Sequence, residues 1–261
     1  MLRARGEGER MSERTIVWFS CGASSAVAAK AAVMHMPNVH VVYCDTSKDE
    51  HEDNVRFLND VERWIGQKVE IIRSAKYQTC DEVYEDTSYM SGIKGARCTM
   101  ELKRLPRLKY QRDGDTHVFG FTADELDRMK DFELNNAFIR CRWILKEMGI
   151  GKEDCFHYLE RAGIALPVLY LQGFKNNNCI GCVKATSPGY WNKVRALYPE
   201  RFAVRAERSR ELGVRLVRVK NKRIFLDELQ FDAMGSWKDL KIEENVSCGP
   251  QCGVSDPAPR G

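Results

Sequence analysis

The stretch TIVWFSCGASSAVAAKAAV, residues 15–33, passes directly from a strand pattern into a helix pattern. Its first five residues are β-branched or aromatic and favour a buried strand, whereas its alanine-rich second half favours a helix. The link between them, SCGASS at residues 20–25, consists of small residues. Such a turn directs backbone N–H groups and the positive end of the helix dipole at one point. The link therefore predicts an anion site, and an ordinary packing turn is the alternative.

Strand and helix patterns continue to alternate after this stretch. Residues 38–46, 68–74 and 117–122 read as strands, and residues 53–66 have helical periodicity that ends at Gly66. Strands that alternate with helices imply parallel pairing through right-handed crossovers. The predicted fold class is therefore α/β, an open doubly wound parallel sheet followed by a mainly helical, cysteine-rich C-terminal portion.

We expect three parts along the chain. Residues 1–14 are polar and predict a disordered N-terminal extension, and residues 15–131 form the α/β domain. Residues 132–261 form the C-terminal portion and end in a flexible tail. Within that portion, residues 190–213 read as one helix and residues 214–229 as a hairpin-like piece.

Composition limits the class of protein. The 261 residues are 43% hydrophobic and 30% charged, enough to bury a sizeable core. The net charge of +4 is too small on this length to indicate nucleic acid by itself. No apolar run is long enough to span a bilayer, and no hydrophobic stretch follows the charged N-terminus. We therefore expect a cytoplasmic protein without a membrane partner.

Ten cysteines are unusual in a cytoplasmic protein, where thiols stay reduced. Two close pairs, Cys179/Cys182 and Cys248/Cys252, could together hold one metal ion or cluster. Structural Zn²⁺, a [4Fe-4S] cluster and redox-active thiols without a metal all remain open. Five scattered cysteines are interpreted as small hydrophobic residues: Cys21, Cys44, Cys80, Cys141 and Cys155.

The link at residues 20–25 resembles the Ser-Gly-Gly-x-Asp-Ser phosphate loop of the PP-loop (adenine nucleotide alpha hydrolase-like, HUP-like) superfamily. Two positions differ from that pattern, because Cys21 replaces a glycine and Ser24 replaces the aspartate. The missing carboxylate removes a group that helps to hold Mg²⁺, which argues against ATP hydrolysis.

Three further segments match that superfamily's phosphoadenylyl-sulfate (PAPS) reductases in order and approximate spacing. Residues 43–61 resemble the segment in which a strand ends in Asp-Thr. Residues 95–110 resemble the Cys-x-x-x-x-Lys region, and residues 120–129 resemble the Gly-x-x-x-x-Glu-x-x-Arg stretch. The resemblance implies contact with the nucleotide or its phosphate and sulfate groups by Asp45, Thr46, Arg97, Lys103, Gly120, Glu125 and Arg128.

Each of these residues also has a plainer interpretation. Asp45 would serve as a helix-capping or turn residue. The cations between Arg97 and Arg107 would form a solvated basic face. Glu125 and Arg128 would form a helical i, i+3 ion pair.

The chain is thus similar to PAPS reductases, and most similar to reductase-like proteins commonly encoded by bacteriophages, which would place it in a bacterial host's cytoplasm. The resemblance implies an adenine nucleotide, either PAPS or ATP with Mg²⁺. It also implies a [4Fe-4S] cluster held by Cys98, Cys179, Cys182 and a tail cysteine, Cys248 or Cys252. The phosphates would be cradled by Ser20, Gly22, Ala23, Ser24 and Ser25.

The tail sequence SCGPQCG partly matches the mobile Glu-Cys-Gly nucleophile of PAPS reductases. Ser247 stands where the glutamate would be, and Cys252 adds a thiol. Cys248 and Cys98 are the candidate catalytic cysteines, activated if cations lower the thiol pKa. The adjacent Cys-Cys pair that many cluster-bearing reductases carry is absent, which weakens a literal assignment as a sulfate reductase.

Three functions follow as hypotheses. The leading one is a PAPS reductase-like oxidoreductase of sulfur metabolism that uses a thiol reductant such as thioredoxin. The second is an adenylating, ATP-dependent sulfurtransferase that thiolates tRNA or DNA. The third is a non-catalytic, zinc-stabilised module that binds nucleic acid through the basic stretch 201–223, for which a solvated helix face is the alternative.

Overall fold

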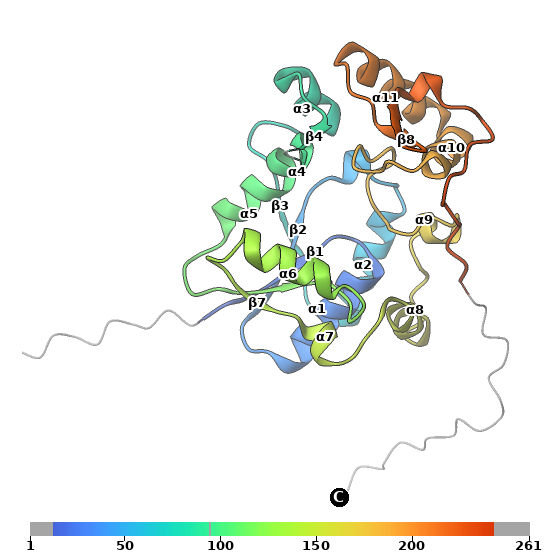
Figure 1. Ribbon diagram of the computed structural model, residues 1–261. Coiled ribbons are helices and arrows are strands. Elements are labelled where there is room, and N and C mark those ends of the chain that lie inside the picture. The colour runs from blue at the N-terminus through green and yellow to red at the C-terminus, as the bar shows by residue number, and fades with distance from the viewer. Residues whose placement is uncertain (1–12, 94, 243–261) are drawn as a thin grey trace, which may run out of the picture.

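The protein, for which we analysed a computed structural model, is described here over residues 13–93 and 95–242. Its centre is a five-stranded sheet in the order β3-β2-β1-β6-β7, and all four strand pairs are parallel (Figure 1). The fold is thus α/β with a doubly wound parallel sheet, as the sequence predicts. The strands are β1 (Thr15–Phe19), β2 (Val39–Cys44), β3 (Glu70–Ile72), β6 (Thr116–Phe119) and β7 (Arg140–Arg142).

Strand β1 is the central strand, and each of its residues is buried. Val17 pairs with Val41 of β2 on one side and with Val118 of β6 on the other. Because the chain adds strands on both sides of β1, the strand order reverses between β1 and β6. Ligands of open α/β sheets bind at the carboxyl ends of the strands at such a reversal.

Side chains of β1 alternate between the two faces of the sheet. Val17 and Phe19 pack into a core with four helices, whereas Ile16 and Trp18 pack into an aromatic core on the opposite face. The helices of the first core are α1 (Ala23–His35), α2 (Asn54–Ile65), α7 (Ile144–Glu147) and α8 (Lys152–Arg161). The second core is covered by α5 (Leu105–Tyr110) and α6 (Leu126–Asn135).

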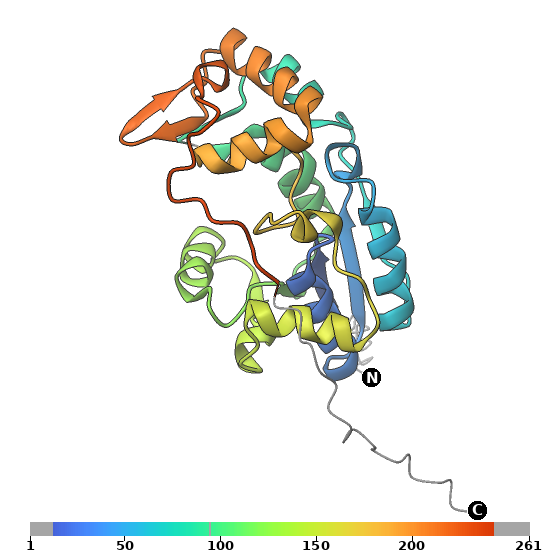
Figure 2. The ribbon, with the colours of Figure 1, turned by 90° about the vertical axis from the view of Figure 1, so that its right-hand side faces the viewer.

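The chain from residue 168 to residue 233 forms a third core together with two earlier helices. Figure 2 shows the helices after residue 187 grouped at one end of the molecule, with the β8–β9 hairpin projecting from them. The elements of this part are α3 (Cys80–Thr87), α4 (Arg97–Thr99), α9 (Val168–Leu171), α10 (Pro188–Leu197), α11 (Pro199–Glu211), β8 (Val217–Val219) and β9 (Lys222–Ile224). Short elements complete the chain: 3₁₀ turns at Ser47–Asp49 and Leu226–Glu228, a π-helical turn at Met100–Arg104, and strands β4 (Ser91–Gly92) and β5 (Gly95–Ala96).

Two elements differ from the sequence predictions. The single helix predicted over residues 190–213 is instead two helices, because Pro199 cannot donate an N–H and disfavours helical geometry at Tyr198. The sheet also continues past the predicted boundary near Phe132, since β7 pairs with β6. Over the described ranges, every helix is too short or too polar to cross a membrane.

Candidate functional site

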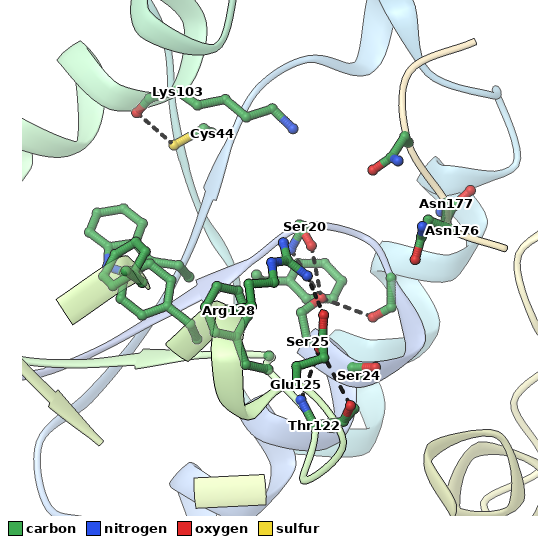
Figure 3. A pocket seen from close by; sticks show the side chains of 18 of the residues that line it. Ser20, Ser24, Ser25, Cys44, Lys103, Thr122, Glu125, Arg128, Asn176 and Asn177 are labelled. Carbon is green, nitrogen blue, oxygen red and sulfur yellow. Dashed lines mark hydrogen bonds and ion pairs between the residues drawn. The ribbon is translucent and has the colours of Figure 1, made fainter. Parts of the chain in front are cut away.

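A large cavity lies where β1 and β6 end, at the reversal of strand order. It has a volume of about 790 Å³, within the range of small-molecule sites. Figure 3 shows Ser20, Ser25 and Arg128 on one side of this space and Lys103 across from them. Of the residues that the sequence assigned to nucleotide binding, eight line this cavity: Ser20, Gly22, Ser24, Ser25, Lys103, Gly120, Glu125 and Arg128.

The loop between β1 and α1 is closed by the hydroxyl of Ser25. This hydroxyl donates to the carbonyl oxygen of Gly22 at 2.9 Å and accepts from the backbone N–H of Ser20 at 3.1 Å. Cys21 has a φ of 54°, a left-handed conformation that favours glycine, and its side chain is buried. Cys21 thus adopts a backbone geometry that glycine adopts more readily than other residues.

Gly120 brings the end of β6 against this loop. A Cβ atom at this position would lie 2.6 Å from both the backbone nitrogen and the Cα atom of Ser25. No side chain fits at that separation without moving the backbone. Gly120 therefore sets the width of the cavity at the loop rather than contacting a ligand through a side chain.

Cations outnumber carboxylates around the cavity. Five cationic side chains line it, against the carboxylates of Asp124 and Glu125. Glu125 is already paired with Arg128, so the predicted i, i+3 ion pair exists and forms part of the wall. Burial lowers the pKa of Lys152, as expected for a cation with reduced access to water. The lining cations are Lys103, Arg104, Arg107, Arg128 and Lys152.

Four other predicted binding residues lie away from the cavity lining. Asp45 accepts a hydrogen bond from the Arg73 guanidinium at 2.8 Å. Burial opposes ionisation of Asp45, but hydrogen bonds from Ser47 and the charge of Arg73 lower its pKa. Arg97 pairs with Glu101 at 2.8 Å. The Thr46 hydroxyl donates to a carboxylate oxygen of Glu50, and Thr46 lines a second, smaller cavity that is described below. Ala23 is buried, and its backbone N–H donates to the Tyr170 hydroxyl.

A second cavity, of about 70 Å³, brings four cysteines together. Cys80 begins α3, Cys98 lies in α4, and Cys179 and Cys182 come from the loop before α10. Cys80 is buried in the third core, and Cys98 and Cys179 pack against that core. All four thiols are free, so no disulfide links them.

Polar and charged groups surround these thiols. The Tyr84 hydroxyl donates to the Cys98 sulfur at 3.1 Å. The hydrogen bond from Cys80, together with that from Tyr84 and the charges of Lys184 and Arg205, lowers the pKa of Cys98 despite its burial. The lowered pKa favours the thiolate form of Cys98.

The two cavities share a wall. Thr99, Lys103 and Asn178 line both of them. The Lys103 ammonium lies 4.0 Å from a carboxylate oxygen of Glu50. Burial opposes its charge, but Cys179 and Glu50 raise the pKa of Lys103, so it stays protonated between the loop cavity and the thiols.

The cysteines that line the second cavity match the predicted metal ligands only in part. Cys248 and Cys252 lie outside the described residues, so their roles remain predictions. Among the residues that are described, no three His, Cys, Asp or Glu side chains form a ready-made site for a metal ion. Cys80, interpreted from sequence as a small hydrophobic residue, is buried in the third hydrophobic core and also lines the second cavity beside three predicted ligands.

Sequence reasoning missed several residues that build these sites. Cys80 has no close cysteine neighbour in sequence, so no spacing motif marks it. Asn177 bonds to the Cys21 carbonyl oxygen at 2.6 Å and ties the C-terminal portion to the loop. The only available signal for Asn177 is its place in the polar run NNN just before Cys179.

The chain resembles known proteins in fold rather than in sequence. No family model matches it, and no curated protein matches it in sequence. Among solved structures, it is similar to the phosphoadenylyl-sulfate (PAPS) reductase from Candida auris in its phosphate complex, with a TM-score of 0.49 and 12% identity. The match covers 65% of this chain and 82% of that chain. The likeness is one of fold.

Proposed function

We propose that this protein is an enzyme of sulfur chemistry that binds an adenine nucleotide in the loop cavity and acts together with cysteine thiols. The observation that carries this proposal is the wall shared by the two cavities, formed by Thr99, Lys103 and Asn178. A ligand anion in the loop cavity and a thiolate in the second cavity would both face the same lysine.

The loop cavity suits a phosphorylated ligand. Hydroxyls of Ser20 and Ser24 line it beside the amino end of α1, where backbone N–H groups and the helix dipole favour anions. The excess of cations over carboxylates adds to this preference. Together these groups support a ligand with more than one negative charge.

The leading reaction is reduction of PAPS. A cysteine thiolate, for which Cys248 remains the candidate, attacks the sulfonate sulfur, and a sulfur–sulfur bond forms. The bond from that sulfur to the phosphate oxygen breaks, and adenosine 3′,5′-bisphosphate leaves. A second thiol then attacks the cysteine sulfur and releases sulfite, which leaves a disulfide. An external dithiol such as reduced thioredoxin returns this disulfide to thiols.

A soft metal centre fits the second cavity, because thiolates are the ligands that Zn²⁺ and iron–sulfur clusters prefer. Cys98, Cys179 and Cys182, the predicted ligands of the core, all line it. Zn²⁺ would supply a fixed structure and positive charge there, and a [4Fe-4S] cluster would supply electron transfer or positive charge. Lys103 orients the substrate anion in either case.

A second candidate is the adenylating sulfurtransferase that acts on tRNA or DNA. It needs Mg²⁺ with ATP, and Ser24 replaces the loop aspartate that would help to bind this ion. Asp124 and Glu125 on the cavity wall offer carboxylate oxygens of the type that Mg²⁺ prefers. These two side chains support the sulfurtransferase as the second candidate, because they could bind Mg²⁺ in place of the missing loop aspartate.

Calorimetry with PAPS and with ATP plus Mg²⁺ tests nucleotide binding, and assays for sulfite and pyrophosphate separate the two reactions. Lys103→Met should weaken nucleotide binding by about tenfold or more, because a charge-assisted hydrogen bond contributes roughly 1.5–3 kcal/mol. The matched control is Lys109→Met, an exposed lysine of the adjoining helix α5 that does not line the cavity. Equal effects of both variants, or no binding of either nucleotide, would overturn the proposal.

A further inference from the structure

We infer that Cys80 completes a four-thiolate site with Cys98, Cys179 and Cys182, and that the buried pair Asp49–Arg205 positions these ligands. The site takes a soft metal centre, either Zn²⁺ or an iron–sulfur cluster. This inference deepens the proposed function and rests on it only for the role of the bound centre in catalysis. In this ligand set, Cys80 of the folded core takes the place of the predicted tail cysteine, Cys248 or Cys252.

The four thiols come from three separate segments that meet at one small cavity. Cys80 joins the other three in space, because it lines the same cavity and is buried in the core against which Cys98 and Cys179 pack. Cys179 and Cys182 are joined by a tight turn in which Gly181 has a φ of 71°. Four cysteines that line one cavity offer the type of donor that structural zinc sites and four-cysteine clusters use.

Asp49 fastens two of these segments to each other. It is fully buried at the end of a 3₁₀ turn just after β2. Its carboxylate accepts from the backbone N–H of Cys80 at 2.7 Å, and its carbonyl oxygen accepts from the N–H of Ile180 at 2.8 Å. One residue therefore fixes the backbone of Cys80 and that of the Cys179–Cys182 turn.

Arg205 reaches the same segments from helix α11. It is 2% exposed, and its guanidinium lies 3.6 Å from the second carboxylate oxygen of Asp49. It donates to the Gly181 carbonyl oxygen at 3.3 Å and pairs with Asp81, the residue after Cys80. It also lies over the ring of Tyr84, whose hydroxyl donates to Cys98. Arg205 thus contacts the surroundings of all three ligand segments.

The energetics favour a positioning role for this pair. A buried ion pair is weak evidence for stability, because desolvation offsets most of the attraction between the charges. Groups that hold metal ligands in place, by contrast, typically affect metal affinity or activity by about 10–100-fold. Arg205 and Lys184 also place positive charge beside four thiolates, which would otherwise repel one another.

Metal content after anaerobic purification tests the ligand set. Iron, acid-labile sulfide and zinc are measured per chain for the wild type, for Cys80→Ser, and for a double variant with Cys248→Ser and Cys252→Ser. Cys141→Ser, on strand β7, is the matched control. We expect Cys80→Ser to lose the metal, and the double variant and the control to keep it.

Iron with sulfide in the wild type would identify a cluster, and zinc without sulfide would identify a zinc site. Three outcomes would each overturn the ligand set. Cys80→Ser could keep the metal, the tail variant could lose it, or the wild type could contain neither iron nor zinc. Circular dichroism of each variant shows whether it folds. If Cys80→Ser fails to fold, Cys80→Ala and the tail variant still decide between the two sets. These measurements need no nucleotide, so their failure is distinguishable from failure of nucleotide binding.

The positioning role is tested by Asp49→Asn, which keeps the shape of the side chain and removes its charge. Competition with a chelator of known affinity should show metal binding weakened by about 10–100-fold. Asp115→Asn is the control, because Asp115 forms a buried pair with Arg14 away from both cavities. We expect it to lower the melting temperature without changing chelator competition. Equal effects of the two variants on metal affinity would show that Asp49 is merely structural.

Discussion

Gly120 shows how a single residue without a side chain shapes the candidate nucleotide site. Gly120→Ala would place a methyl group 2.6 Å from the backbone of Ser25, so the loop or the strand end must move. We expect nucleotide binding to weaken at least tenfold and stability to fall by about 1–3 kcal/mol, as for an overpacked site. Calorimetry and thermal melting measure the two effects. Gly114→Ala is the control, because Gly114 has a left-handed backbone conformation and no atom lies within 4 Å of its added Cβ. This variant should lower stability and leave nucleotide binding unchanged. Loss of binding in Gly114→Ala would contradict the explanation for Gly120.

His117 makes stability depend on pH. It is buried in β6 and accepts a hydrogen bond from the Trp18 indole at 3.0 Å. Burial, with the charges of Arg107 and Arg14, lowers its pKa from 6.5 to about 4, although Asp115 acts in the opposite direction. The folded state therefore holds a neutral imidazole, and the unfolded state takes up the proton first as the pH falls.

This contribution to stability is fully present above the unfolded pKa and is lost as the pH falls towards the folded pKa. Between about pH 7 and pH 5, it should decrease by about 2 kcal/mol. Urea unfolding of the wild type and of His117→Asn at both pH values measures the difference. The variant should lose less stability over this interval, and an equal loss in both proteins would exclude His117 as the cause.

At the scale of elements, regular patterns could be predicted and long-range contacts could not. Helix α2 ends at Gly66 with a φ of 79°, because the sequence carries both the helical period and its stop signal. Strand β7, with the sequence RCR, has no apolar pattern, and its strand geometry comes from pairing with β6. The small-residue link at residues 20–25 is likewise local in sequence. Cys80 joins the other thiols only through tertiary contacts, which no sequence spacing encodes.

At the scale of the whole molecule, two portions of the chain meet to form both cavities. Asn177 bonds to the loop at Cys21, and Arg201 bonds to the carbonyl oxygen of Lys48 just after β2. The C-terminal portion thus covers the carboxyl ends of the central strands and brings Cys179 and Cys182 next to the loop cavity. Because one wall serves both cavities, a ligand in either cavity is expected to affect the other, and the effect must be reciprocal.

Nucleotide binding should therefore protect the thiols of metal-free protein from alkylation. A nucleotide in the loop cavity would contact Lys103 and Thr99, which also line the cavity that contains Cys98. We expect saturating PAPS or ATP to slow the reaction of Cys98 with iodoacetamide by at least threefold, measured peptide by peptide with mass spectrometry. Cys141 is half-buried on β7 and lines neither cavity, so its rate should stay constant. If Cys98 reacted at the same rate with and without a bound nucleotide, the two cavities would be independent, and the nucleotide would not lie against the shared wall.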